Sequence, residues 1–246
     1  MTTTRNRKQL PEFGILDGYK VDISALLKFC HENEYFDTDM YNDINASSNS
    51  KMKAFVVANS FSKENFFKDS TENFLESKLY KQKYLTEIYD NVDVSNNGSK
   101  SNNILTRTKR LDKNSTNYVP EADEHNYGKR NKLAVGEIET VLNMFKGNLA
   151  RVRLAYLSPN FSLKPHVDYD PSYITRYHIP LLTNEDCLMC VKVKGVEKNI
   201  HFPADGNVYF LNAGHIHWAE NNSNEGRIHL IVDTKNQEDL QWLQPI

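Results

Sequence analysis

A histidine and an aspartate stand two residues apart in His166-Val167-Asp168, just after a turn that runs from Pro159 to Pro165. In an extended segment, side chains two residues apart point to the same face. An imidazole and a carboxylate in this arrangement can therefore reach one metal ion together. A second histidine, His217, follows much later in the chain, in another segment that we expect to be a strand.

Two histidines and one carboxylate form the facial triad that suits non-haem Fe(II) and leaves coordination positions open. His215 is an alternative to His217 as the third ligand, because residues two apart can share one strand face. The ten-residue interval from His217 to Arg227, and the HxxEN sequence that begins at His217, favour His217. Zinc and copper bind such nitrogen and oxygen sites more tightly than Fe(II), so a metal found in a purified sample would not identify the native one.

Arg227 begins an apolar segment that continues from Ile228 to Val232. The planar fork of a guanidinium can bind a carboxylate through two parallel hydrogen bonds, as the distal end of 2-oxoglutarate would require. A lone arginine at a strand end is ordinarily a partner in a surface salt bridge. The position of Arg227 after the triad favours a role in binding an anion.

The segment from Tyr173 to Leu182 should place Arg176 and His178 on one strand face. Unpaired charge is costly to bury. This face therefore either lies in solvent or lines a site that holds anionic ligands, and the second interpretation agrees with the triad. By contrast, His201 and His229 look like ordinary strand residues.

The rest of the chain must position these groups. Residues 149–246 contain short apolar segments separated by turn signals, a pattern typical of a sandwich or barrel. We therefore expect a mostly β fold, with an all-β core over 149–246 and a mixed α/β region over 1–148 that packs on it as one domain. The expected strands cover residues 149–157, 173–182, 187–194, 198–202, 207–211, 214–220 and 227–233.

The N-terminal region is less regular. We predict an irregular lead-in over 1–18, a short strand over 19–23 and a helix through Ala25 to Cys30 that is capped by Asp22 or Ser24. Hydrophobic periodicity predicts further helices over 64–89 and 135–145. Between them lies a polar loop near 91–130, with a small basic run at 107–110, which is a candidate lid over the site.

Composition narrows the function classes. The chain has 246 residues and a formal net charge of -2, which disfavours binding to nucleic acid or to an anionic membrane surface. The first residues lack the apolar stretch of a signal peptide, and three cysteines are too few for a disulfide scaffold, so we expect a cytosolic protein. Cys187 and Cys190 are three apart and would face opposite ways in a strand, which indicates core residues rather than a redox or zinc site.

Three stretches resemble the aspartyl/asparaginyl β-hydroxylase family, which includes related free-amino-acid hydroxylases. They are PHVD at 165–168, RYHIPLLTN at 176–184 and HWAENNSNEGRIHLIVD at 217–233. The resemblance extends over residues 151–233, which are about a third of the chain. It implies a double-stranded β-helix of jelly-roll or cupin type with flanking N-terminal helices.

The resemblance also implies a set of ligands and roles. Fe(II) would be held by His166, Asp168 and His217, and 2-oxoglutarate by Arg227 with a contribution from His178. Arg176 would face the co-substrate or a substrate carboxylate.

The implied function is a dioxygenase that uses Fe(II), 2-oxoglutarate and O2 to hydroxylate an amino acid, free or in a peptide, of the aspartyl, asparaginyl or prolyl type. The alternative from another class is a non-catalytic β-helix module that binds a metal or a small anion. A nucleic-acid oxygenase is disfavoured by the balanced charge. We therefore expect a small amino acid or peptide as partner, and neither nucleic acid nor membrane. The sequence predicts no oligomeric state.

Overall fold

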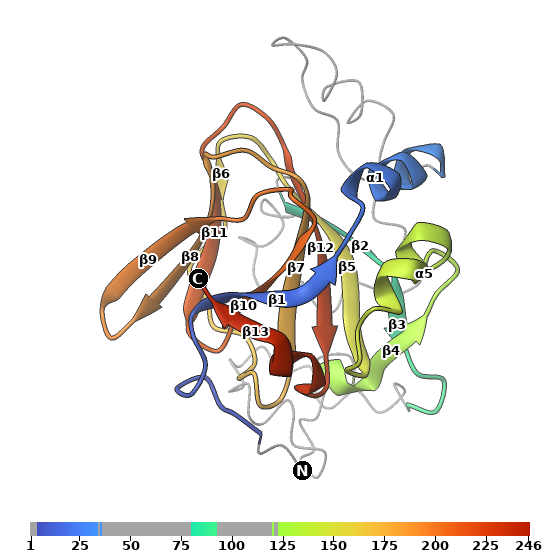
Figure 1. Cartoon of the computed structure of the whole chain (residues 1–246), viewed down its shortest axis with the longest axis horizontal. Coiled ribbons are helices and arrows are strands. Elements are labelled where there is room, and N and C mark those ends of the chain that lie inside the picture. The colour runs from blue at the N-terminus through green and yellow to red at the C-terminus, as the bar shows by residue number, and fades with distance from the viewer. Residues whose placement is uncertain (1–3, 34, 36–79, 93–119, 121–122) are drawn as a thin grey trace, which may run out of the picture.

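The computed structural model describes residues 4–33, 35, 80–92, 120 and 123–246 (Figure 1). The C-terminal half of this chain forms eight consecutive antiparallel strands. They are β5 (Leu149–Leu157), β6 (Phe161–Ser162), β7 (Thr175–Leu182), β8 (Cys187–Val193), β9 (Val196–His201), β10 (Asn207–Leu211), β11 (Ile216–Asn221) and β12 (Arg227–Thr234).

These strands divide between two sheets in a fixed alternation. A large sheet has the order β13-β1-β10-β7-β12-β5-β2, and a small sheet has the order β6-β11-β8-β9. Along the chain, β5, β7, β10 and β12 enter the large sheet, while β6, β8 with β9, and β11 enter the small one. This winding between two facing antiparallel sheets is a double-stranded β-helix, and it confirms the expected fold class.

The N-terminal region and the C-terminus extend this core. β1 (Phe13–Lys20) lies between β10 and β13 (Leu243–Pro245), and β2 (Tyr80–Tyr84) pairs with β5 at the opposite edge of the large sheet. A separate two-stranded sheet joins β3 (Thr86–Ile88) to β4 (Tyr127–Arg130). The helical elements within the described residues are α1 (Ile23–Glu32), α5 (Gly136–Leu142) and the 3-10 turns η3 (Glu124–Asn126) and η4 (Glu238–Trp242).

Both faces of the large sheet are covered, because side chains alternate along each strand. On β12, Ile228, Leu230 and Val232 join an apolar core that includes residues of helices α1 and α5. The opposite face of the large sheet meets the small sheet in a second core, which includes Leu157 of β5 and Met189 of β8. As a result, every residue of β12 is buried.

The N-terminal predictions needed correction at several points. β1 begins at Phe13, although we predicted an irregular lead-in over 1–18 and a strand only over 19–23. The strand begins earlier because its backbone pairs with both β10 and β13. The helix after it is confirmed as Ile23–Glu32, with the Asp22 carboxylate accepting from the amide of Ala25. The predicted helix over 135–145 is confirmed as α5.

The predicted helix over 64–89 is wrong for the part that the structure describes. Residues 80–84 and 86–88 are strands, because pairing with β5 and β4 satisfies their backbone groups in extended form. Residues 64–79 lie outside the described residues, as does the basic run at 107–110. The expected polar loop near 91–130 ends earlier than predicted, since η3 and β4 occupy 124–130.

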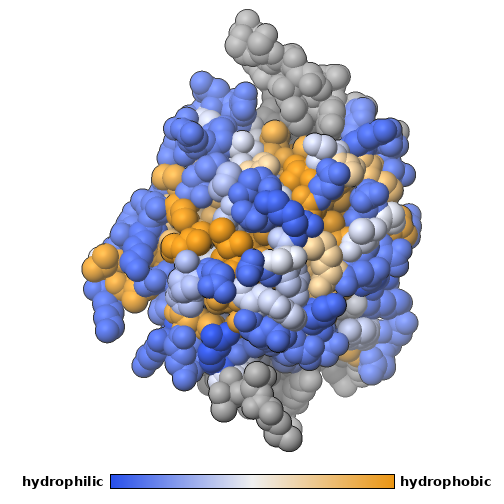
Figure 2. Space-filling view, in the orientation of Figure 1, coloured by the Kyte–Doolittle hydropathy of each residue, from blue (hydrophilic) through white to orange (hydrophobic). Residues whose placement is uncertain are grey.

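Hydrophilic and hydrophobic residues both reach the surface, and the two cysteines of β8 lie inside. Figure 2 shows a face on which hydrophilic residues are abundant and interrupt the hydrophobic ones. No helix within the described ranges is long and apolar enough to cross a membrane. Cys187 and Cys190 are buried and form no disulfide, which confirms that they are core residues.

One buried amide fixes the turn that leads into Arg227. The Asn221 side-chain nitrogen donates to the carbonyls of Leu157, Ser158 and Glu225, at 3.2, 3.0 and 2.7 Å. Its oxygen accepts from the Ser223 amide and hydroxyl, at 3.1 and 2.7 Å. Asn221 thereby ties the end of β5 to the β11–β12 turn.

We expect Asn221→Ala to lower the free energy of unfolding by about 2–3 kcal/mol, because buried carbonyls and a hydroxyl lose their partner. Chemical denaturation measures this change. The neighbouring Asn222→Ala is the matched control, since Asn222 is exposed and its change should stay within about 0.5 kcal/mol. Equal effects of the two substitutions would contradict the role given to Asn221.

Candidate functional site

Backbone pairing brings the two candidate ligand segments together. The amide of His166 donates to the carbonyl of His217 at 3.0 Å, and the amide of His217 donates back at 2.8 Å. The amide of Asp168 donates to the carbonyl of Ala213 at 2.9 Å. These bonds continue the pairing of β6 with β11 beyond the end of β6. The imidazoles of His166 and His217 consequently lie side by side, with ring centroids 4.4 Å apart.

His166, Asp168 and His217 each offer one ligand atom, and these atoms all lie within 4.8 Å of one another. Nδ1 of His166 is 2.8 Å from the carbonyl of Lys164, and Nδ1 of His217 is 3.0 Å from the carbonyl of His215. A carbonyl can only accept, so each Nδ1 carries the proton and each Nε2 keeps a lone pair for a metal. Burial, which outweighs the attraction of Asp168, lowers the pKa of His217 to about 4 and keeps this imidazole neutral.

The geometry favours His217 over His215. Nε2 of His215 lies 3.1 Å from the carbonyl of Arg7, away from the other two candidate ligands. Nε2 of His217 lies 3.7 Å from Oδ2 of Asp168. Two imidazole nitrogens and one carboxylate at this spacing fit the ligand set of a facial triad.

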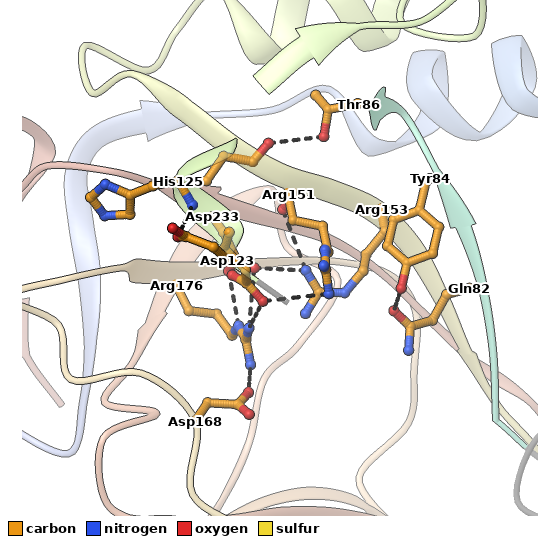
Figure 3. Close-up of polar contacts among 12 residues, drawn as sticks. Gln82, Tyr84, Thr86, Asp123, His125, Arg151, Arg153, Asp168, Arg176 and Asp233 are labelled. Carbon is orange, nitrogen blue, oxygen red and sulfur yellow. Dashed lines mark hydrogen bonds and ion pairs between the residues drawn. The ribbon is translucent and has the colours of Figure 1, made fainter. Parts of the chain in front are cut away.

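A buried ion network holds the acidic member of the triad (Figure 3). Asp233 accepts from Nε of Arg176 at 2.8 Å and from Nη1 of Arg153 at 2.7 Å. The same Arg176 donates through Nη1 to Oδ2 of Asp168. Glu124 lies 3.9 Å from Arg176. Arg176 is thus a bridge between a fully buried carboxylate and a candidate metal ligand.

Asp233 is ionised in spite of its burial. Burial would raise the pKa of this carboxyl, but Arg176 and Arg153 outweigh it and lower the pKa to about 2. The structure therefore gives the predicted ligand-binding arginine, Arg176, partners within the protein itself. A contact of Arg176 with a co-substrate or substrate stays a prediction.

A second group of buried polar side chains lacks such partners. Arg227 is 2% exposed, and its Nη1 lies 3.2 Å from the sulfur of Met189. Its Nε has no hydrogen-bond partner among the described residues, nor have the Nε2 atoms of His178 and His229. Buried polar groups are normally hydrogen-bonded, so these three nitrogens could be satisfied by a polar ligand. A carboxylate would fit them.

Strand register relates Arg227 to the triad. Met189 pairs with Ala219, and Val191 pairs with His217, on the adjacent strands β8 and β11. Met189, which contacts Arg227, is therefore two residues along the strand from the level of His217, or roughly 7 Å.

The sequence interpretation missed three members of this interior. His229 was expected to be an ordinary strand residue, yet it is 1% exposed and faces His178. Asp233 and Arg153 were not singled out at all. The signal for His229 and Asp233 is the alternation on β12, where both share one face with Arg227. Arg153 lies on β5.

The model of the aspartyl/asparaginyl beta-hydroxylase family matches residues 121–237 of this chain. This match confirms the resemblance found in the sequence. A comparison with curated proteins finds no match.

Several solved structures are similar over part of the chain. A 2OG-Fe(II) oxygenase family oxidoreductase from Burkholderia pseudomallei is 17% identical, with a TM-score of 0.35, over 42% of this chain and 60% of that one. A Pseudomonas putida prolyl-4-hydroxylase is 18% identical, with a TM-score of 0.30, over 41% and 58%. A cupin domain from Bordetella pertussis is 13% identical, with a TM-score of 0.29, over 37% and 86%. The chain thus spans less than two thirds of either oxygenase, and these likenesses carry no argument about activity.

We expect Asp233→Asn to lower the free energy of unfolding by about 3–5 kcal/mol, because Arg153 and Arg176 lose a buried counter-charge. The pKa of Asp233 is lowered in the folded protein, so its stabilisation is present above pH 4 and is lost as the pH falls toward 2. Denaturation of the variant should therefore depend less on pH in this window than that of the wild type. An unchanged pH dependence would contradict the ionised state given to Asp233.

Proposed function

We propose that this chain is an Fe(II)- and 2-oxoglutarate-dependent dioxygenase that hydroxylates an amino acid, free or in a peptide, of the aspartyl, asparaginyl or prolyl type. Two observations carry the proposal: the triad of possible metal ligands, and the buried Arg227, whose Nε has no partner within the part of the chain described. Arg227 contacts Met189, which lies two residues along the paired strands from the level of His217. A ligand that reaches both a metal and a guanidinium needs a group for each. The keto acid and distal carboxylate of 2-oxoglutarate supply them.

Each site residue has a proposed role in binding the metal or the co-substrate. His166, Asp168 and His217 would hold the iron, and Arg176 would keep the Asp168 carboxylate ionised and oriented. Arg227 would bind the distal carboxylate through its fork, and His178 would donate a further hydrogen bond. The burial of Arg227 and His178 would exclude water and strengthen their contacts with the distal carboxylate. Bound iron supplies the oxidising chemistry by which 2-oxoglutarate and O2 become succinate and CO2 while a substrate C–H bond becomes C–OH.

The substrate proposal follows from charge as well as from the family. Arg176 is the group that we expect to meet a substrate or co-substrate carboxylate, and an amino acid provides one. We keep the expectation of a cytosolic protein that acts on a small molecule or peptide, without nucleic acid or membrane as partner. The informative screen offers free amino acids and short peptides, with succinate release and a mass gain of one oxygen as readouts.

His166→Ala should abolish succinate formation from 2-oxoglutarate in the presence of Fe(II), because one of three metal ligands is lost. His166 is exposed, so the substitution should leave the fold intact. His215→Ala is the matched control, and it should keep activity within a few-fold of the wild type. If the wild type forms no more succinate than His166→Ala, the chain is better described as a non-catalytic module that binds a metal or small anion.

Arg227→Lys should raise the KM for 2-oxoglutarate on the order of 10-fold to 100-fold, since lysine keeps the charge but not the two-pronged geometry. Metal affinity should not change, because Arg227 is not one of the ligands. Initial rates at varied 2-oxoglutarate, together with a Co(II) absorption titration, measure the two effects. A variant that loses metal binding but keeps the KM would place Arg227 in a different role.

A further inference from the structure

Two buried imidazoles face each other between the sheets. His178 of β7 and His229 of β12 are 2% and 1% exposed, and their Nδ1 atoms lie 3.3 Å apart. The rings meet edge to face, with centroids 5.5 Å apart at 78°. Each Nε2 is buried and has no hydrogen-bond partner among the described residues. We call these two side chains the histidine pair.

The contact between the two Nδ1 atoms determines the protons on the pair. A hydrogen bond between them needs one proton, which one ring donates and the other accepts. If both rings are neutral, the donor ring has a bare Nε2 and the acceptor ring carries its proton on Nε2. The neutral histidine pair therefore offers one donor and one acceptor at its two Nε2 atoms.

The surrounding charges keep the pair neutral in the absence of an anion. Burial is the largest influence and Arg227 the second, and together they lower the pKa of both imidazoles well below the ordinary value. The other charged or titratable groups that act on the pair are Arg176, Arg153 and Asp233 for His178, and His201 for His229. Asp233 is the one group among these that favours protonation of His178, and it is already engaged by two arginines.

We propose that His178 and His229 bind the distal carboxylate of the co-substrate together with Arg227, and that this binding takes up one proton from solvent. The inference rests on the proposed function. A carboxylate can only accept hydrogen bonds, so the bare Nε2 must gain a proton before both rings can donate to it while the hydrogen bond between their Nδ1 atoms is kept. The pair then carries one positive charge, which the arriving carboxylate balances.

The consequence is an affinity for 2-oxoglutarate that depends on pH. A bound carboxylate raises the pKa of the pair above its value in the free protein. Between these two pKa values, each unit of acidification should tighten binding by up to about tenfold, and above the higher one the dependence should disappear.

The test is calorimetric titration of 2-oxoglutarate into the Mn(II)-loaded protein, at one pH in two buffers that differ in ionisation enthalpy. The difference in observed heat gives the number of protons taken up. His229→Gln and His178→Gln keep an amide donor but cannot gain a proton. His201→Gln is the matched control, because its imidazole also acts on His229 but is bonded through Nδ1 to the carbonyl of Cys187.

We expect uptake of about one proton in the wild type and in His201→Gln, and about none in His229→Gln or His178→Gln. Binding without proton uptake in the wild type, or equal uptake in the wild type and both pair variants, would overturn this inference and leave the proposed function intact. Absence of any binding would overturn both. Should one pair variant fail to fold, the other variant and the wild-type proton number still decide the question.

Discussion

β12 is buried along its whole length, yet one of its faces carries an arginine, a histidine and an aspartate. Charge can persist in such a place only if it is partnered. At the Asp233 end, two arginines satisfy the carboxylate, and the network closes on itself through Arg176 and Asp168. At the Arg227 end, the hydrogen-bond donors outnumber the hydrogen-bond acceptors. The interior between the sheets is therefore charge-balanced at one end and short of an anion at the other.

The Asp233 end and the Arg227 end of this interior therefore differ in charge balance. The balanced end holds the triad carboxylate in place through Arg176. At the other end, Nε of Arg227 and Nε2 of His178 and of His229 lack partners among the described residues, and an anion bound there as proposed would supply them. Under the proposed function, the same alternation of side chains on β12 would serve both the metal ligands and the anion site.

Much of the core could be predicted because its signals are local. Turn residues and alternation located β5 and β10 with the bounds that the structure shows, and His166, Asp168 and His217 were recognisable by type and spacing. β2 was missed because its sequence, Tyr80-Lys-Gln-Lys-Tyr84, has no apolar alternation, and its extended form depends on pairing with β5. The partnership of Arg176 with Asp233 could not be read from spacing, since it is created by the adjacency of β7 and β12.

The reciprocal amide-to-carbonyl bonds between His166 and His217 involve no side-chain atom. The main chain, and not the imidazoles, therefore sets how the two histidine segments lie against each other. With His166 exposed, a metal ion bound to these ligands would be within reach of a chelator. Because zinc and copper bind nitrogen and oxygen ligands more tightly than Fe(II), the supply of metal would contribute to which ion occupies such a site.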